Sequence, residues 1–239
     1  MRVFPSNATG WFWHCLARET GTIGHLYSPG AQVGPYPWFP YAMDNGCFSL
    51  WNRKDNSFDE SRWLNEVEAE WKKMLLWAEA VNKRPLWLIV PDRPGDSAET
   101  LKKWIAYAPE LKSRQVCKLA IAAQDGMSPD DVRSLQIKPD IICVGGSDEW
   151  KWETVEMWAR EFPRVHVLRC NAPGKLEYLH DLGIESCDGT GWLRGDRRQT
   201  EGVEKFVRKH GKPIEPLVPL ARMVCRKVRS KNTELQLIP

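Results

Sequence analysis

Residues 118–146, KLAIAAQDGMSPDDVRSLQIKPDIICVGG, contain two short apolar segments on either side of a polar, helix-forming one. The apolar segments 118–123 and 140–144 are almost continuously hydrophobic, which is typical of strands buried on both faces of a parallel sheet. The small or polar sequences QDG and GGS follow the two strands directly. This stretch therefore predicts a βα unit whose polar groups gather at the carboxyl ends of its strands.

The same alternation recurs from residue 59 to the end of the folded region, with one more strand before it. Predicted helices cover 59–82, 96–107, 128–135, 149–160, 173–182 and about 199–209. Predicted strands cover 41–44, 86–90, 118–123, 140–144, 165–169 and 185–188. One or two further strands in the first 40 residues would bring the number close to eight.

A closed barrel fits this pattern better than an open sheet. No strand is followed by G-x-G-x-x-G or by a P-loop sequence, the usual signatures of doubly wound nucleotide-binding sheets. We therefore predict an α/β fold, a compact (β/α)₈ TIM barrel over residues 1–210. A basic C-terminal arm over 211–239, which begins with the proline-containing GKPIEPLVPLARM, would pack on the barrel or extend from it.

The net charge of +3 is the sum of two unlike parts. Residues 1–193 hold 22 Lys and Arg against 26 Asp and Glu, whereas residues 194–239 hold 12 against 5. An acidic body with a basic end is suited to a polyanion such as nucleic acid, although a charged segment can equally be a solvated face.

Membrane and metal sites are not indicated. No run approaches the roughly 18 apolar residues that span a bilayer, and the start MRVFPSNATG lacks the apolar core of a signal peptide. The seven cysteines are widely spaced, and His166 and Cys170 would lie too far apart on one strand to share a metal. We therefore expect a cytoplasmic protein, in the host cytoplasm if the chain is viral, with no membrane partner, metal or cofactor.

Two carboxylates are the strongest catalytic candidates. Asp44 in YAMDNGCFS and Asp188 in ESCDGTGW each end a buried strand and precede a glycine-containing turn. Such a pair can divide the work of retaining glycosyl transfer, in which one carboxylate attacks the anomeric carbon and the other moves a proton. The alternative for each is a turn or capping role. Asp92 and Gln124 could bond a heterocycle edge, and the Gly145-Gly146 backbone could approach a ligand closely.

Read in order, these strand ends resemble the tRNA-guanine transglycosylase superfamily, and most closely its short phage-type branch, the DNA 7-deazaguanine transglycosylases. YAMDNGCFS is similar to the family's D-S-G-G-F/Y-Q element, IVPD to its base-recognition strand, AAQDG to its V-Q-G-G strand and ICVGGSDEW to the Gly-rich turn that follows. CNAPGKLEYLHDLGIESCDGTGW is similar to its G-x-P-x-x-L…G-x-D-x-x-D block. The resemblance covers about residues 36–194.

The resemblance implies exchange of guanine in DNA for a 7-deazaguanine base, preQ0 or a derivative. Asp188 would be the nucleophile that attacks C1′, and Asp44 the general acid/base. Phe48 would stack on the base. The base edge would be held by Asp92, Gln124, Gly145 and Gly146.

One departure from the family concerns nucleic-acid binding. Members that act on tRNA carry a C-x-C-x-x-C…H zinc site after the nucleophile, whereas this chain has only Cys225 there. A basic segment takes its place, and we expect it to bind phosphates without reading sequence. Lys205, Arg208 and Lys209 would share a helix face, and charge reversal at Arg197, Arg198 and Lys205 should weaken DNA binding. The predicted phosphate-binding residues are Arg194, Arg197, Arg198, Lys205, Arg208 and Lys209.

Three alternatives stay open on the sequence alone. The same chemistry could act on tRNA. A barrel N-glycoside hydrolase would instead release the base with water as acceptor. A non-catalytic nucleic-acid-binding barrel would bind DNA in a salt-sensitive way without either aspartate.

Overall fold

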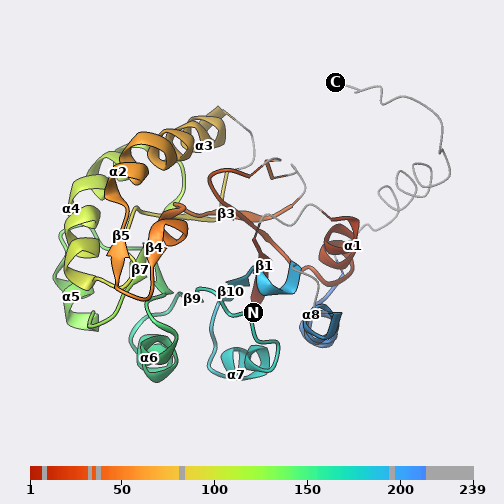
Figure 1. Ribbon diagram of the computed structural model, residues 1–239. Coiled ribbons are helices and arrows are strands. Elements are labelled where there is room, and N and C mark those ends of the chain that lie inside the picture. Colours follow the sequence, from red (N-terminus) through yellow and green to blue (C-terminus); the bar gives the residue numbers. More distant parts are fainter. Residues whose placement is uncertain (7–9, 32–33, 36–38, 81–83, 194–196, 214–239) are drawn as a thin grey trace.

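The computed structural model describes residues 1–6, 10–31, 34–35, 39–80, 84–193 and 197–213. Eight parallel strands form one sheet, in the spatial order β1-β10-β9-β8-β7-β6-β3-β2. In Figure 1 the helices surround these strands in chain order. The strands are β1 (Arg2–Pro5), β2 (His25–Tyr27), β3 (Tyr41–Met43), β6 (Trp87–Ile89), β7 (Lys118–Ala123), β8 (Ile141–Val144), β9 (Val165–Val167) and β10 (Ser186–Gly189).

The two edge strands, β1 and β2, meet and nearly close the sheet. Isolated parallel bridges join Val3 to Ile23 and Ser6 to Leu26. Every strand therefore lies beside its neighbours in sequence, and β10 lies beside β1. This is the predicted α/β architecture, a (β/α)₈ TIM-like barrel.

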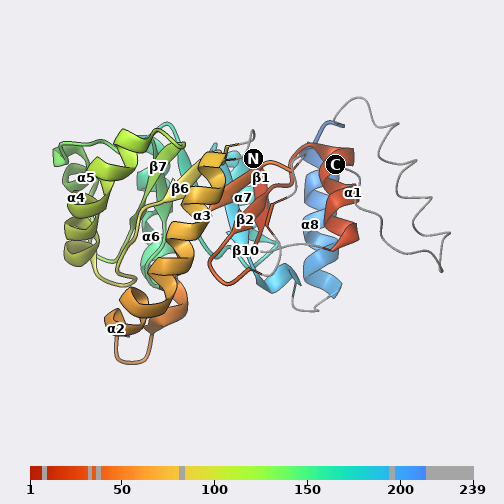
Figure 2. The same cartoon turned by 90° about the horizontal axis from the view of Figure 1, so that it is seen from above.

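Helices run back along the outside of the barrel and place the strand ends at one rim (Figures 1 and 2). The predicted helix over 59–82 is divided by a π-helical turn, Trp63–Val67. Helix α4 continues through Pro109 and ends seven residues past its predicted end. The helices are α1 (Trp11–Thr20), α2 (Glu60–Arg62), α3 (Glu68–Ala80), α4 (Ser97–Arg114), α5 (Pro129–Ser134), α6 (Asp148–Glu161), α7 (Lys175–Asp181) and α8 (Arg197–His210).

Two elements were not predicted from the sequence. Helix α1 lies between β1 and β2 and packs beside α8 (Figure 2). A short antiparallel hairpin, β4 (Trp51–Asn52) with β5 (Ser57–Phe58), follows β3. Trp51 begins this hairpin and Arg53 lies in its turn, and both residues line a cavity at the carboxyl ends of the barrel strands.

Alternation along the strands separates two apolar layers. One set of side chains packs between the sheet and the helices, and the other fills the barrel interior with, among others, Phe4, Leu26, Trp87, Ile89 and Cys143. Toward the carboxyl ends the interior becomes polar. Burial of the apolar layers thus leaves the polar groups gathered at the end where barrel enzymes carry their sites.

The C-terminal region is described only in part. Residues 211–213 follow α8, and the N–H of Lys212 donates to the carbonyl of Thr20 at the end of α1. The predicted arm over 211–239 otherwise lies outside the described residues. No helix within the described ranges combines the length and the apolar character needed to cross a bilayer.

Candidate active site

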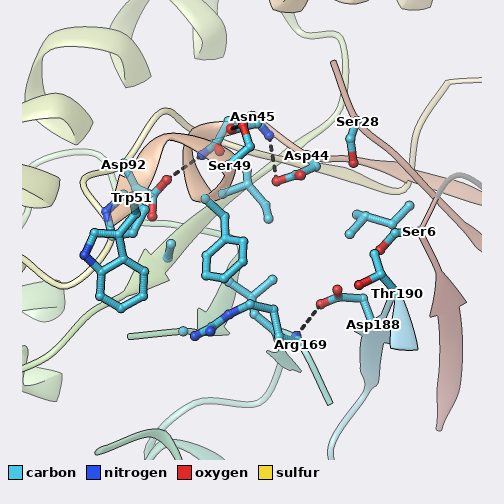
Figure 3. Close-up of a pocket in the computed structure, with 18 of the residues that line it drawn as sticks. Ser6, Ser28, Asp44, Asn45, Ser49, Trp51, Asp92, Arg169, Asp188 and Thr190 are labelled. Atoms are coloured by element: carbon cyan, nitrogen blue, oxygen red, sulfur yellow. Dashed lines mark hydrogen bonds between the residues drawn. The ribbon is translucent and has the colours of Figure 1, made fainter. Parts of the chain in front are cut away.

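A cavity of about 430 Å³ opens at the carboxyl ends of the strands (Figure 3). It brings together seven residues that the sequence nominated: Asp44, Phe48, Asp92, Gln124, Gly145, Gly146 and Asp188. Ser6, Ser28, Asn45, Trp51, Arg53, Arg169, Asn171 and Thr190 also line it.

Asp188 stands on β10 inside the barrel and is almost fully buried. Its Oδ1 accepts a hydrogen bond from the backbone N–H of Arg169 at 3.0 Å and lies 3.1 Å from Nε2 of His166. Both contacts fall on the same oxygen. The carboxylate is therefore held in one orientation while Oδ2 remains for a ligand.

His166 is a site residue that the sequence analysis missed. It lies on β9 with no exposed surface, and its Nδ1 is 2.8 Å from the hydroxyl of Ser186. Ser186 and Asp188 are two residues apart on β10, so both point into the barrel, and Ser186 is paired in register with His166. Only the pairing of β9 with β10 brings His166 next to Asp188, and this pairing cannot be read from the sequence.

Asp44 follows β3 and points into the same cavity as Asp188 (Figure 3). Its Oδ1 accepts the N–H of Asn45 at 2.9 Å. Burial, and then the negative charge of Asp188, raise the pKa of Asp44 to about 6. A carboxyl group with this pKa can hold a proton near neutral pH and also release it, as a general acid/base must.

Asp92 is the centre of a buried hydrogen-bond network. The side-chain amide of Asn45 donates to its Oδ1 at 2.8 Å, and that of Gln124 donates to its Oδ2 at 2.5 Å. Burial raises the pKa of Asp92, and these amide hydrogen bonds act against that rise. Each carboxylate oxygen has a second lone pair, so Asp92 can still accept N–H groups from a ligand.

Gln124 and the Gly145-Gly146 turn are already engaged with one another. The N–H of Gly145 donates to Ala123, and the N–H of Gly146 donates to Oε1 of Gln124 at 2.9 Å. Gln124 therefore fixes the turn and Asp92 at once. A ligand would have to exchange these bonds to reach the two N–H groups, and we expect the turn to shape the cavity wall rather than to supply free donors.

Phe48 lies in a 3₁₀ helix, Cys47–Leu50, at the rim. The residue is 37% exposed, and the guanidinium groups of Arg53 and Arg169 lie over its ring at 4.8 and 4.4 Å from the ring centroid. Trp51 meets the ring edge to face at 5.9 Å. A base that stacks on Phe48, as the resemblance implies, would therefore share the ring with an arginine.

Two of the three basic residues predicted to share a face of α8 are in ion pairs. Arg208 pairs with Glu204 and with Glu19 of α1. Lys209 pairs with Glu177 of α7, the helix that neighbours α8 on the other side. These two cations are already matched by carboxylates and point to different helices.

The basic residues of α8 are also far apart along the helix axis. The helix runs away from the rim, so Arg208 lies about 16 Å along the axis from Arg197. Arg197 pairs with Glu201, and Lys205 is exposed. Arg198 also begins the helix, and Arg194 lies outside the described residues. The start of α8 therefore lies nearer to the cavity mouth than its end does.

Among the described residues, no three His, Cys, Asp or Glu side chains lie together as a metal site would require.

Fold and site together define an α/β barrel with an acidic cavity at its rim. No family model matches the chain, and no curated protein matches it.

Proposed function

We propose that this protein is a glycosyltransferase that exchanges guanine in DNA for a 7-deazaguanine base, preQ0 or a derivative. The observation that carries the proposal is the pair Asp44 and Asp188, which face one cavity but have different surroundings. Asp188 is oriented by two contacts, whereas Asp44 has a raised pKa. The cavity volume suits a ligand the size of a nucleoside.

The mechanism divides between the two carboxylates. Oδ2 of Asp188 attacks C1′ of the target nucleotide, and the bond from C1′ to the guanine nitrogen breaks. Asp44 donates a proton to the departing base. The incoming base then attacks C1′ from the side that guanine left, gives its proton to Asp44 and releases Asp188, so the sugar keeps its configuration.

Recognition of the base is assigned to the Asp92 network. Its carboxylate oxygens accept N–H groups of a guanine-like edge, and Asn45 and Gln124 hold the carboxylate in place. The target base must first leave its stack, which costs a few kcal/mol, and a partly exposed aromatic ring such as Phe48 offers a replacement surface.

Mass spectrometry of nucleosides tests the proposal. DNA is incubated with the protein and labelled 7-deazaguanine bases, and the digest should contain the labelled deoxynucleoside. Asp188→Ala should abolish incorporation, and the matched variant of an exposed aspartate on α7, Asp181→Asn, should retain it. Incorporation that survives in Asp188→Ala would refute the mechanism.

The alternatives appear as distinct products of the same experiment. Label in tRNA but not in DNA would assign the other nucleic acid. An abasic product without label would indicate an N-glycoside hydrolase, which needs only water as acceptor. Salt-sensitive DNA binding with no exchange and no trapped adduct would indicate a binding protein.

A further inference from the structure

Three carboxylates and two arginines line the cavity. Asp44, Asp92, Asp188 and Arg169 line the cavity (Figure 3), and so does Arg53. Asp92 and Asp188 are almost fully buried, whereas 14% of the Arg169 side chain and 54% of the Arg53 side chain are exposed. An anionic nucleic-acid strand is repelled by the carboxylates unless cations stand between them and its backbone. The rim is the place where such cations are needed.

The rim carries a surplus of positive charge. Asp148, the first residue of α6, faces Arg53 at 3.8 Å, Arg169 at 3.9 Å and Lys151 at 2.9 Å. Lys151 is fully buried and neutralises this carboxylate from within the protein. The two arginines reach it only at long distance, so both guanidinium groups remain able to bind a stronger anionic partner.

Arg169 links the rim to the proposed nucleophile. Its backbone N–H holds Asp188, and its guanidinium group donates to the carbonyl of Gly146. Its φ of 57° is in the left-handed region, which costs a non-glycine residue roughly 1–2 kcal/mol. Only 14% of the side chain is exposed. A buried arginine held in a strained conformation beside a catalytic carboxylate is typical of a functional position.

We propose that Arg53 and Arg169 bind a phosphodiester group of a single nucleic-acid strand at the cavity mouth, next to the nucleotide whose sugar reaches Asp188. The phosphate takes the place of Asp148 on the two guanidinium forks, whose planar geometry matches phosphate oxygens. Trp51, which lies beside Phe48, provides apolar surface for the adjoining sugar or base. The assignment rests on the proposed function, but it concerns strand binding rather than base exchange.

Binding of fluorescein-labelled oligothymidylate, measured by anisotropy over a salt series, tests the site. This strand has no guanine, so binding does not depend on exchange. Arg53→Gln and Arg169→Gln should each weaken binding about tenfold. Each should also reduce the slope of log K against log salt by about 0.7. Arg53→Lys should keep the slope. The control Arg160→Gln changes an exposed arginine near the end of α6 that pairs with Glu156, and it should leave both quantities unchanged.

Folding of each variant is checked by thermal unfolding. Glutamine already occupies a left-handed position at Gln115, with φ 52°, so Arg169→Gln is compatible with the local backbone. Arg53 has 54% of its side chain exposed. If Arg169→Gln fails to fold, Arg53→Glu provides a second variant, and it should weaken binding more than Arg53→Gln.

The outcomes separate this site from the proposed function. Loss of strand binding in the rim variants supports the site even if no base is exchanged. Unchanged binding in Arg53→Gln and Arg53→Glu, an equal loss in Arg160→Gln, or no strand binding by the wild type would overturn it, whether or not exchange occurs. A parallel series with oligouridylate shows whether the strand is DNA or RNA.

Discussion

His166 Nε2 lies 3.1 Å from Oδ1 of Asp188, and on its other side the imidazole meets the hydroxyl of Ser186. A neutral ring satisfies both partners when Nε2–H donates to the carboxylate and Nδ1 accepts from the serine. Phe4 and Trp87 pack against the ring and prevent it from turning. The histidine is therefore a positioning residue for the carboxylate.

His166→Ala should slow formation of the covalent nucleic-acid adduct and leave affinity for the free base nearly unchanged. A hydrogen bond to a charged group contributes about 1.5–3 kcal/mol. His166→Gln should restore part of the rate, because its amide can replace the Nε2–H donor. The adduct is measured in single turnover on denaturing gels.

A variant that only loses packing should lower stability without slowing adduct formation. Leu179→Ala removes a buried side chain of α7 and should lower the free energy of unfolding by about 2–5 kcal/mol without slowing adduct formation at a temperature where it is folded. Equal rates in His166→Ala and Leu179→Ala would show that the histidine does not act through Asp188.

Stability should depend on pH through Asp44. Its pKa is raised from 3.8 to about 6 in the folded protein, so between these values the unfolded carboxyl is ionised while the folded one keeps its proton. Raising the pH through this window destabilises the wild type. Asp44→Asn removes the effect and should be more stable above about pH 6 by about 1–2 kcal/mol, a figure reduced for partial solvent screening.

Denaturant unfolding across the window measures this difference, with Asp181→Asn as the matched exposed control. The control should follow the wild type at every pH. A constant difference in free energy between the wild type and Asp44→Asn over the whole range would contradict a raised pKa. Adduct formation should also decline above about pH 6 in the wild type, because guanine departure needs the protonated acid.

The sequence contained much of the fold and of the cavity floor, because both follow from short-range patterns. Apolar runs identified six strands, and the residues just after them, such as Asp92 and Gln124, must meet at one rim of a parallel barrel. The partners across strands could not be found in this way. His166 faces Asp188 only through the register of β9 with β10, and two of the acids that pair with α8, Glu19 and Glu177, come from α1 and α7.

Asn45 should matter for base binding through Asp92. Asn45→Ala removes the amide from Oδ1 of Asp92 and the acceptor for the N–H of Cys47. Because the amide acts against the raised pKa of Asp92, its loss should raise that pKa further. Calorimetric titration with a 7-deazaguanine base should show at least severalfold weaker binding, and the free energy of unfolding should fall by about 1–3 kcal/mol. Asn52→Ala, in the exposed hairpin, is the control, and equal affinities in the two variants would remove Asn45 from the site.

Gly146 should tolerate no side chain, for two separable reasons. Its φ is 69°, and a Cβ atom there would clash with Oδ2 of Asp125 and meet Cε3 of Trp150 at 2.9 Å. Gly146→Ala therefore combines backbone strain with a steric clash that displaces the turn from Gln124. We expect a loss of more than about 2 kcal/mol in the free energy of unfolding, together with weaker base binding.

Two other glycines separate these contributions. Gly183 has a φ of 76° but open space around its Cβ position, so Gly183→Ala should show strain alone, about 1 kcal/mol. Gly174 has a φ of −62° and open space, so Gly174→Ala should be nearly neutral. Denaturant unfolding of the three variants should rank them in that order. If Gly146→Ala lost no more stability than Gly183→Ala, the turn would be free to move, and the Gln124 bond to Gly146 would not fix the wall of the cavity.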